Sequence, residues 1–498
     1  MPDLILYNGK LHTQDESYPT ATALAIEQGV IRAVGADEEI RALARRGAET
    51  VDLKGKRVIP GLVDSHFHLF DWAHAQQQLT LNTAQSVDDL LTLLAAYAHK
   101  SGTPGWILGK GWNETRWPAA RIPTRHDLDR CVSHRPVILW RSDMHLAVAN
   151  SQALQAAGIN ANTPNPPQGV IDRDASGEPT GVLRELAINL VRAVIPPPSE
   201  DETLAALKSA FPRLHQMGLT GLHDFRIMGG EDGPPAFRAY QALDAARALP
   251  LRLWMNIPGE RLEEAIALGL RTGFGSPYLR IGHLKLFSDG SQGARTAWML
   301  EPYLDAGGAG LPLTPMAEIA RAVRQAEAAG IAVAVHAIGD RANRELLDVF
   351  EEALEPGDAA RARRGYACHR IEHVQNIRPD DIQRLAGLGL AASVQPIHAT
   401  DDFPMIETSV GERSRYTYAF RTLLEADVLL PLGSDAPVAN PNPLAGIHAA
   451  VTRQRPDGTP PGGWHPEHCL SVAEAVWGYT MAPALATGQA SRLGSLSP

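Results

Sequence analysis

The sequence predicts a (β/α)8 barrel of the TIM type, with a small β-sandwich-like subdomain before it and a large insertion after barrel strand 1. Eight apolar runs of strand length each end on polar residues, and alanine- and leucine-rich helical stretches separate most of them. Such continuous apolar runs suit strands that are buried on both faces. A doubly wound open sheet would show the same alternation. However, no Gly-rich dinucleotide fingerprint opens any of the helices, so the barrel is favoured.

The N-terminal β subdomain is assigned to residues 1–57. Its segment "LILYNGKLHT" contains the tight Asn-Gly turn signal, and "TALAIEQGVIRAVG" repeats a strand-turn-strand pattern. The barrel is assigned to residues 58–480, and a C-terminal segment, 481–498, follows it. The predicted barrel strands are 58–68, 218–225, 251–257, 278–290, 331–340, 366–375, 390–398 and 428–436.

An insertion is predicted over about residues 69–217, between the first two barrel strands. These are about 150 residues, whereas an ordinary βα unit needs only about 30. Barrel chemistry occurs on this loop side, so the insertion is expected near the site. Five of the nine tryptophans lie in it or at its start, and they either line an apolar pocket or form its core. They are Trp72, Trp106, Trp112, Trp117 and Trp140.

The strand ends predict a metal site. In "PGLVDSHFHLF", His66 and His68 are two residues apart, so on a strand both imidazoles face the same side. Alone, this pair is more typical of two satisfied histidines at a strand end than of a metal site. Burying many polar groups at one barrel mouth is costly unless they satisfy one another or bind a metal. The other strand-end residues are Asp224, Asn256, Lys285, His336, His373, Gln395 and Asp435.

Composition and charge exclude several classes of protein. A net charge of −10 without a compensating basic stretch argues against a nucleic-acid binder. No run approaches ~18 uninterrupted apolar residues, so no membrane span is expected. The N-terminus has no signal peptide pattern, and three dispersed cysteines fit a reducing, cytoplasmic compartment. A small-molecule substrate is expected, and a homo-oligomer is left open.

The motifs at these strand ends resemble those of the amidohydrolase superfamily. They are "PGLVDSHFH", a lysine on the fourth strand, "HAIGD", "RIEH" and "GSDAPV". Further stretches are similar to its amidohydrolase-3 branch, which includes N-substituted formamide deformylases: "GWNETRWP", "PVILWRSDMHLAVANSQAL", "GEPTGVLRE", "LKLFSDGSQGARTAWM" and "RIEHVQN". The resemblance covers nearly the whole chain.

The resemblance implies a first metal ion held by His66, His68 and Asp435. Imidazole and carboxylate ligands suit zinc, although iron, manganese or cobalt would also fit. The implied reaction is hydrolysis of a non-peptide C–N bond, of the amide or formamide type, through metal-activated hydroxide. Asp435 would be the general base and acid.

The resemblance also implies a second metal ion, held by His336 and His373. Lys285 would bridge the two ions as a carbamate formed from its neutral amine and carbon dioxide. The alternative is an unmodified Lys285 paired with Asp289, which would leave a one-metal site. His283 and His369 are interpreted as histidines of the barrel interior.

Candidate substrate contacts are less sharply defined. In "RSDMH" the residues Arg141, Asp143 and His145 alternate, and with Asn150 they either face the substrate or form a structural polar ladder. His145 is the candidate hydrogen-bond donor to a developing oxyanion. The predicted substrate-binding residues are Trp112, Arg141, Asp143, Asp224, Asp289, Arg295 and Gln395.

Two further points bear on fold and function. Superfamily members usually continue past the last helix with strands that complete the small β domain, and that completion is absent from residues 481–498. Unpaired strand edges are then expected at the N-terminal segment. Alternative functions are a deaminase, an ester or lactone hydrolase, and a non-catalytic scaffold or regulatory relative.

Overall fold

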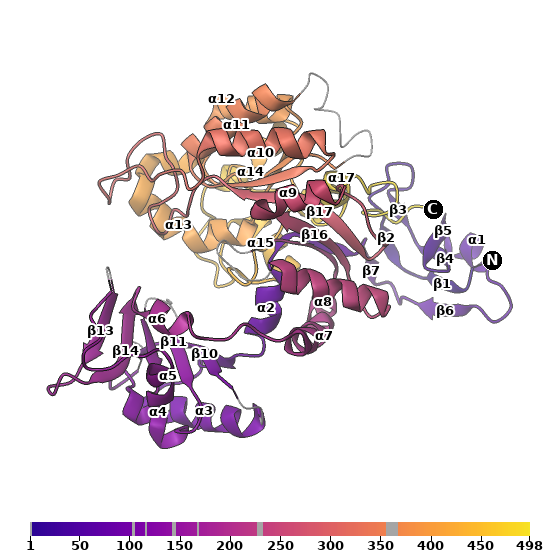
Figure 1. Ribbon diagram of the computed structural model, residues 1–498. Helices are drawn as coiled ribbons and strands as arrows, with labels where there is room; N and C mark the ends of the chain where they lie inside the picture. The colour runs from indigo at the N-terminus through magenta and orange to yellow at the C-terminus, as the bar shows by residue number, and fades with distance from the viewer. Residues whose placement is uncertain are drawn as a thin grey trace. The chain divides into compact units, whose positions relative to one another are not determined.

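A computed structural model describes residues 2–101, 105–114, 117–141, 146–166, 169–226, 233–354 and 367–498. The chain divides into two compact units, one made of Met1–Trp72 with Leu207–Pro498 and the other of Ala73–Ala206. Figure 1 labels their helices and strands. Each unit is described by itself below.

The larger unit contains the predicted barrel. Seven parallel strands pair in the order β20-β19-β18-β17-β16-β15-β8. Their bounds are β8 (Leu62–Phe67), β15 (Leu219–Asp224), β16 (Arg252–Pro258), β17 (Leu279–Phe287), β18 (Val333–Ala337), β19 (Arg370–His373) and β20 (Ala391–Ser393). Six of them lie within a predicted run and β16 extends one residue past its run, so the barrel prediction is confirmed.

The eighth predicted run, 428–436, closes the barrel without forming a regular strand. Its segment lies between the two edges of the sheet: Ser65 N–H donates to Leu432 O, and Gly433 N–H donates to Val394 O. Isolated parallel bridges join Val394 to Leu432 and Phe67 to Ala436. The ladder is broken here because Pro431 has no N–H to donate.

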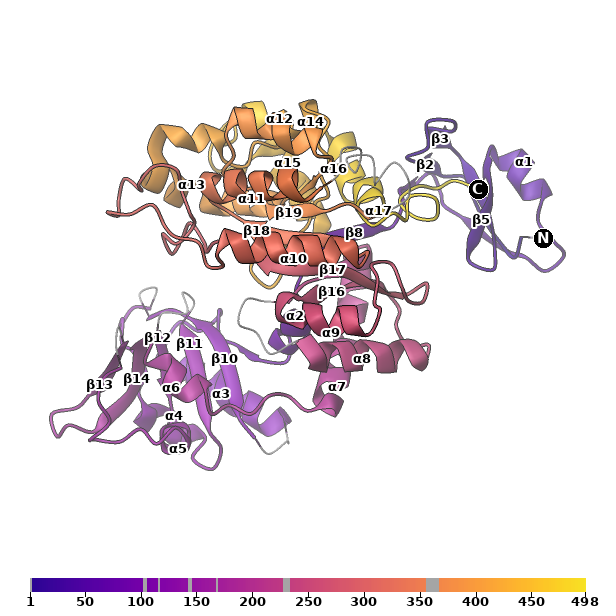
Figure 2. The same ribbon diagram turned by 45° about the horizontal axis from the view of Figure 1, so that its top comes forward.

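Helices cover the outside of this sheet, as Figures 1 and 2 show for α10 to α12. In α10 the buried residues Ile319, Ala320, Val323 and Ala326 recur every three or four positions, which gives the helix one apolar face. The helices of this unit after the insertion are α7 (Glu200–Gln216, which starts in the insertion), α8 (Gly233–Ala245), α9 (Leu262–Ala267), α10 (Met316–Ala328), α11 (Asp340–Ala353), α12 (Pro379–Gly387), α13 (Pro396–Val410), α14 (Phe420–Glu425), α15 (Pro443–Thr452), α16 (Val472–Gly478) and α17 (Met481–Ala486).

The insertion unit is built on a six-stranded mixed sheet, ordered β13-β14-β12-β11-β10-β9. Along β11, Leu139 belongs to one apolar cluster while Ile138 and Trp140 belong to another, so both faces of the sheet are covered. Its elements are β9 (Leu79–Thr80), α3 (Val87–Ser101), β10 (Ile107–Trp112), α4 (Arg125–Cys131), β11 (Val137–Arg141), β12 (Leu146–Ala149), α5 (Ser151–Ala156), β13 (Gly169–Arg173), β14 (Pro179–Glu185) and α6 (Ile188–Arg192).

The tryptophans of the insertion form its core. Trp112 and Trp117 belong to one apolar cluster, Trp140 belongs to the other, and Trp106 packs against the second. Trp112 has no exposed surface, and its indole N–H donates to Leu139 O. Trp112 is therefore a core residue, and its prediction as a substrate contact was wrong.

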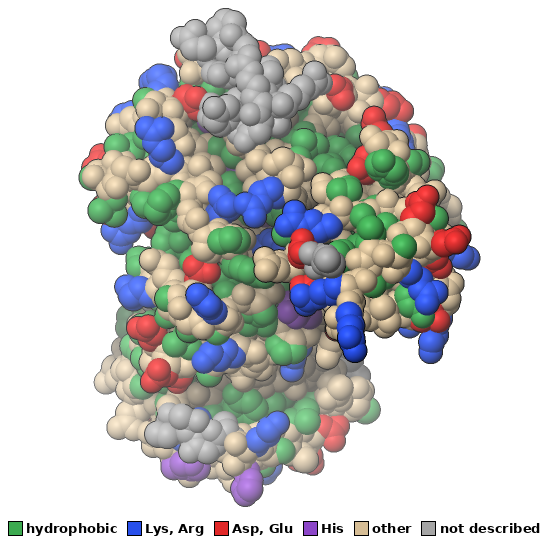
Figure 3. Space-filling view, turned by 90° about the vertical axis from the view of Figure 1, so that its right-hand side faces the viewer, with side chains coloured by type: hydrophobic (Ala, Val, Ile, Leu, Met, Phe, Trp, Pro, Cys, Tyr) green, Lys and Arg blue, Asp and Glu red, His purple; other side chains and the backbone are tan. Residues whose placement is uncertain are grey.

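The N-terminal segment folds into two small sheets, β5-β4-β1-β6 and β3-β2-β7, with one short helix, α1 (Asp37–Ala42). The C-terminal segment returns to it, since Leu496 N–H donates to Thr13 O. On the face drawn in Figure 3, acidic, basic and apolar side chains are interspersed. The strands are β1 (Leu4–Tyr7), β2 (Lys10–His12), β3 (Thr20–Ala21), β4 (Ala23–Glu27), β5 (Val30–Gly35), β6 (Glu49–Asp52) and β7 (Arg57–Val58).

Among the described residues, no helix combines the length and the apolar character needed to cross a membrane.

Candidate metal centre

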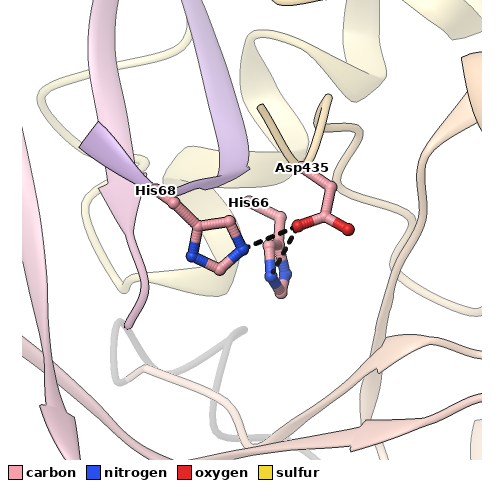
Figure 4. A group of neighbouring side chains, drawn as sticks. All are labelled: His66, His68 and Asp435. Atoms are coloured by element: carbon pink, nitrogen blue, oxygen red, sulfur yellow. Dashed lines mark hydrogen bonds and ion pairs between the residues drawn. The ribbon is translucent and has the colours of Figure 1, made fainter. Parts of the chain in front are cut away.

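The carboxyl ends of β8 and of the closing segment bring three ligand atoms together. Figure 4 shows His66, His68 and Asp435 pointing toward one another. Asp435 Oδ1 lies 2.7 Å from His68 Nε2 and 3.6 Å from His66 Nε2. These three ligand atoms all lie within 4.8 Å of one another, and all three residues are buried. Two imidazoles and a carboxylate are a donor set that fits a divalent metal ion.

The remaining ring nitrogens of this pair are held by the protein. His66 Nδ1 lies 2.5 Å from Glu372 Oε2, and His68 Nδ1–H donates to Phe225 O at 2.7 Å. Metal-binding histidines are oriented in this way, because the hydrogen bond fixes the tautomer and leaves the other nitrogen as the ligand. Both histidines therefore present Nε2.

His336 and His373 lie next to this pair. Their ring centroids are 4.6 Å apart, and those of His66 and His373 are 5.0 Å apart. His373 Nδ1–H donates to Gln395 Oε1 at 2.7 Å, and His336 Nε2–H donates to Gly290 O at 3.2 Å. Among the described residues, Nε2 of His373 and Nδ1 of His336 have no hydrogen bond, so both are candidate ligand atoms. Gln395, predicted as a substrate contact, instead orients His373.

Lys285 is buried beside these histidines. Its Nζ lies 4.9 Å and 4.8 Å from the ring centroids of Phe225 and Phe287. Burial lowers the pKa of Lys285 to about 8, against the opposing effects of Glu372 and Asp435. A neutral amine is therefore more accessible here than on an exposed lysine.

The alternative pairing of Lys285 with Asp289 is not observed. Within the described residues these two side chains form no ion pair, because Asp289 accepts the backbone N–H groups of Trp298, Ile338 and Gly339. Its carboxylate therefore fixes the loop after β17 and the end of β18. Asp289 therefore has a structural role, and its role as a substrate contact stays a prediction.

The protonation states of the site suit metal binding. Burial, with Lys285 nearby, lowers the pKa of His66 to about 4 and that of His336 to about 3, so both are neutral at pH 7. Burial would raise the pKa of Asp435, but its hydrogen bond with His68 and the neighbouring imidazoles hold it well below its usual value. Burial would lower the pKa of His68, but its hydrogen bond to Asp435 and the charge of that carboxylate raise it. Neutral imidazoles and an ionised carboxylate are the forms that coordinate metals, so a metal ion at His68 Nε2 would displace the proton that His68 shares with Asp435.

Two of these residues sit on strained backbone. His373 has φ of 74° and Asp435 has φ of 61°, a left-handed region that non-glycine residues rarely adopt. Strain of this kind is retained where the surrounding structure fixes it, and it concentrates at functional sites. Here the left-handed backbone lies at the last residue of β19 and in the closing segment, the two places that carry His373 and Asp435.

A buried ion pair between Arg370 and Glu372 holds the carboxylate that bonds to His66. Arg370 and Glu372 have no exposed surface, and Arg370 Nε donates to Glu372 Oε1 at 2.5 Å. Arg370 also donates to Ser65 O and Ser393 Oγ. Although burial raises the pKa of Glu372, Arg370 and His66 hold it well below its usual value. The carboxylate is thus charged and available to His66 Nδ1–H.

Two other predicted substrate contacts, Asp224 and Arg295, form hydrogen bonds with nearby groups of the protein. Asp224 Oδ1 accepts Leu69 N–H at 2.7 Å, at the start of α2 (Leu69–Ala75). Arg295 Nε donates to Asp305 at 2.9 Å in the loop after β17. Both groups therefore support the local fold, and their roles as substrate contacts stay predictions.

The "RSDMH" residues are only partly described. Arg141 pairs with Glu114 at 3.1 Å within the insertion unit. Asn150 caps α5 and bonds the backbone around it, which is the structural alternative. Asp143 and His145 lie outside the described residues, so their predicted roles stay predictions.

The interior histidines lie where predicted. His283 accepts a hydrogen bond from Trp254 Nε1 and donates to Cys368 O. His369 Nδ1 accepts Val333 N–H. Both rings are satisfied inside the barrel.

Sequence reasoning missed the residues that surround the ligands. Glu372 and Arg370 stand two apart in "RIEH", so a strand places them on one side. The predicted seventh strand ended on His398, but Gln395 was taken as its polar end. In the structure His398 lies in the first turn of α13, within 4.8 Å of ligand atoms of His373 and Asp435.

The amidohydrolase family matches residues 49–498 of this chain. The chain belongs to the amidohydrolase family. This amidohydrolase is 34% identical over 479 residues to YtcJ of Bacillus subtilis (strain 168), a match that covers 96% of this chain and 88% of that protein. It is 28% identical over 510 residues to N-substituted formamide deformylase of Arthrobacter pascens, which covers 100% of this chain and 91% of that one.

Among solved structures, the amidohydrolase is similar to an uncharacterized metal-dependent hydrolase of Pyrococcus furiosus. The TM-score is 0.82 with 30% sequence identity, covering 99% of this chain and 96% of the other. The resemblance predicted from the motifs is confirmed. The protein is a hydrolase of a metal-dependent, barrel-forming family, with His and Asp groups placed to bind metal.

Proposed function

We propose that this amidohydrolase cleaves a non-peptide C–N bond, of the amide or formamide type, in a small-molecule substrate. One observation carries the proposal: the ionised Asp435 carboxylate lies among four histidines, three of them buried, and the Nε2 atoms of His66 and His68 face its Oδ1. The relative named N-substituted formamide deformylase supports the choice of bond.

The donor set would hold two divalent ions, zinc by ligand preference, with His66, His68 and Asp435 at the first and His336 and His373 at the second. We propose that Lys285 bridges them as a carbamate, which its buried position and lowered pKa support. A bound metal ion supplies Lewis acidity, which polarises a carbonyl and lowers the pKa of water.

Side chains of the protein then transfer the proton of the attacking water. Asp435 is ionised and can accept a proton from the attacking water at its carboxylate. It can return that proton to the nitrogen of the leaving amine, which departs neutral. Glu372 and Gln395 keep His66 and His373 in fixed orientations. The cytoplasmic location stays a prediction from the dispersed cysteines.

Metal content tests the centre directly. Protein purified without chelator is expected to hold about two metal ions per chain by mass spectrometry, because the candidate ligands form two groups.

Carbon-13 bicarbonate should then give a carbamate signal that is lost in Lys285→Met. The same preparation is expected to hydrolyse members of a panel of formamides, N-acyl amino acids and aryl amides, and removal of metal should abolish this.

The other outcomes distinguish the alternatives. About one ion per chain without a carbamate signal would remove Lys285 from the centre and favour a deaminase. Turnover of esters or lactones but not amides would keep the hydrolase and refute the C–N bond. Absence of metal, even after addition of metal and bicarbonate, would refute the proposal.

A further inference from the structure

His398 differs from the other histidines of the centre in one respect. His66, His68, His336 and His373 each have one ring nitrogen held by Glu372, Phe225, Gly290 or Gln395. Neither ring nitrogen of His398 has a hydrogen bond to any residue that the structure describes. Its Nε2 is buried without a partner.

The position of His398 directs this nitrogen toward the centre. The residue lies in the first turn of α13, which begins directly after Gln395. Its ring lies nearly parallel to that of His373, with centroids 6.3 Å apart and planes 14° apart. His398 Nε2 is 3.8 Å from Asp435 Oδ2, the carboxylate oxygen that does not face His68.

Because no described residue holds either ring nitrogen of His398 by a hydrogen bond, His398 does not resemble a metal ligand. Metal-bound histidines almost always donate their second ring N–H to a protein acceptor, which fixes the ring. A buried polar atom without a partner is costly, so a native structure retains one where a ligand or substrate will satisfy it. The distance of 3.8 Å to Asp435 is too long for a hydrogen bond but leaves His398 beside the proposed base.

We propose that His398 is a catalytic residue that donates a hydrogen bond from Nε2–H to the carbonyl oxygen of the substrate. The inference rests on the proposed function. When the water oxygen bonds to the carbonyl carbon, the carbonyl π electrons move onto that oxygen, and the His398 N–H stabilises the charge. Collapse restores the carbonyl and breaks the C–N bond, while the nitrogen takes the proton that Asp435 removed from water. His398 keeps its own proton throughout.

The test compares four single variants of the metal-loaded protein: His398→Asn, His398→Gln, His373→Asn and His448→Asn. His448 is an exposed histidine of α15 and serves as the surface control. The measurements are metal ions per chain, kcat and KM with formanilide, and the affinity for formate by calorimetry. Formate carries an oxygen in the place of the carbonyl oxygen and needs no turnover.

We expect His398→Asn to retain the wild-type metal content and to lose ~10²–10³ in kcat, which is typical of removing one oxyanion donor. KM should change little, and formate should bind about tenfold more weakly, the loss of one good hydrogen bond. The longer side chain of His398→Gln can bring its amide N–H close to the position of Nε2, which the shorter Asn cannot reach, so His398→Gln should recover part of both effects. His373→Asn should lose metal, and His448→Asn should match the wild type.

Three results would overturn the inference. Loss of a metal ion from His398→Asn, as in His373→Asn, would make His398 a ligand. Unchanged kcat and unchanged formate affinity would make it a bystander. If the wild type cleaves no amide, the proposed function fails, but the formate comparison still decides the role of His398. A metal-loaded wild type that binds no formate would also count against it.

Discussion

Replacement of Asp435 by Asn is expected to reduce kcat by ~10²–10⁴, the contribution of a positioned general acid–base group. The amide has nearly the same shape as the carboxylate but cannot accept the water proton. The ionised state of Asp435 in the fold, with a pKa well below its usual value, is the property that is lost. The measurement is kcat and KM at saturating metal, because the amide is also a weaker ligand than the carboxylate.

Asp380 provides the matched control. It is an exposed residue in the first turn of α12, and Asp380→Asn makes the same chemical change away from the centre. It should leave kcat, metal content and Tm unchanged. Retention of full turnover by Asp435→Asn, with metal bound, would show that another group moves the proton. Loss of all metal from Asp435→Asn at saturating metal would instead assign the main role of Asp435 to coordination.

The barrel strands could be predicted because most of their residues are buried and each run is largely apolar before it ends on polar residues. The run "IAVAVHA" contains β18, all but one of whose residues are fully buried. The closing segment, 428–436, was predicted by the same rule although Pro431, which has no N–H, interrupts a regular ladder. The sheet order of the insertion could not be predicted, because its strands pair both parallel and antiparallel with partners far along the chain.

The proximity of the candidate ligands could be predicted because barrel topology collects strand ends at one mouth. The partners of those ligands could not. Glu372 and His66 are 306 positions apart in the sequence, and only the folded sheet shows that they touch. His398 was missed for a different reason: it lies beyond the strand end, and the start of α13 rather than the strand directs its ring. Asp224 and Asp289 show the converse, since polar residues at strand ends also serve as backbone acceptors.

Replacement of Glu372 by Gln is expected to produce the largest loss of stability. It would leave the charge of Arg370, which has no exposed surface, without its ionised partner. Removing one member of a buried pair costs ~3–5 kcal/mol in the free energy of unfolding. Denaturant unfolding of the metal-free protein measures this loss without the contribution of bound metal.

The pH dependence of stability gives a second readout for the same pair. Because the pKa of Glu372 is lowered in the fold, its contribution is complete above the ordinary glutamate pKa of ~4.3 and is lost as pH falls through the lower folded-state value. Glu372→Gln lacks this titration, so the difference in stability from the wild type should shrink as the pH falls below ~4. A difference that stays constant down to low pH would show that charge pairing is not its source.

A double variant, Arg370→Met with Glu372→Leu, distinguishes the effect of Glu372 on stability from its effect on metal affinity. Replacing both members of a buried pair with apolar residues is often neutral or stabilising, so much of the lost stability should return. His66 Nδ1–H, however, still has no acceptor in this variant, because its partner was Glu372 Oε2. Metal affinity should therefore stay ~10–100-fold below that of the wild type, the usual cost of losing such a partner. Recovery of both stability and metal affinity would show that Glu372 serves only to neutralise Arg370, whereas recovery of stability alone assigns it the orientation of His66.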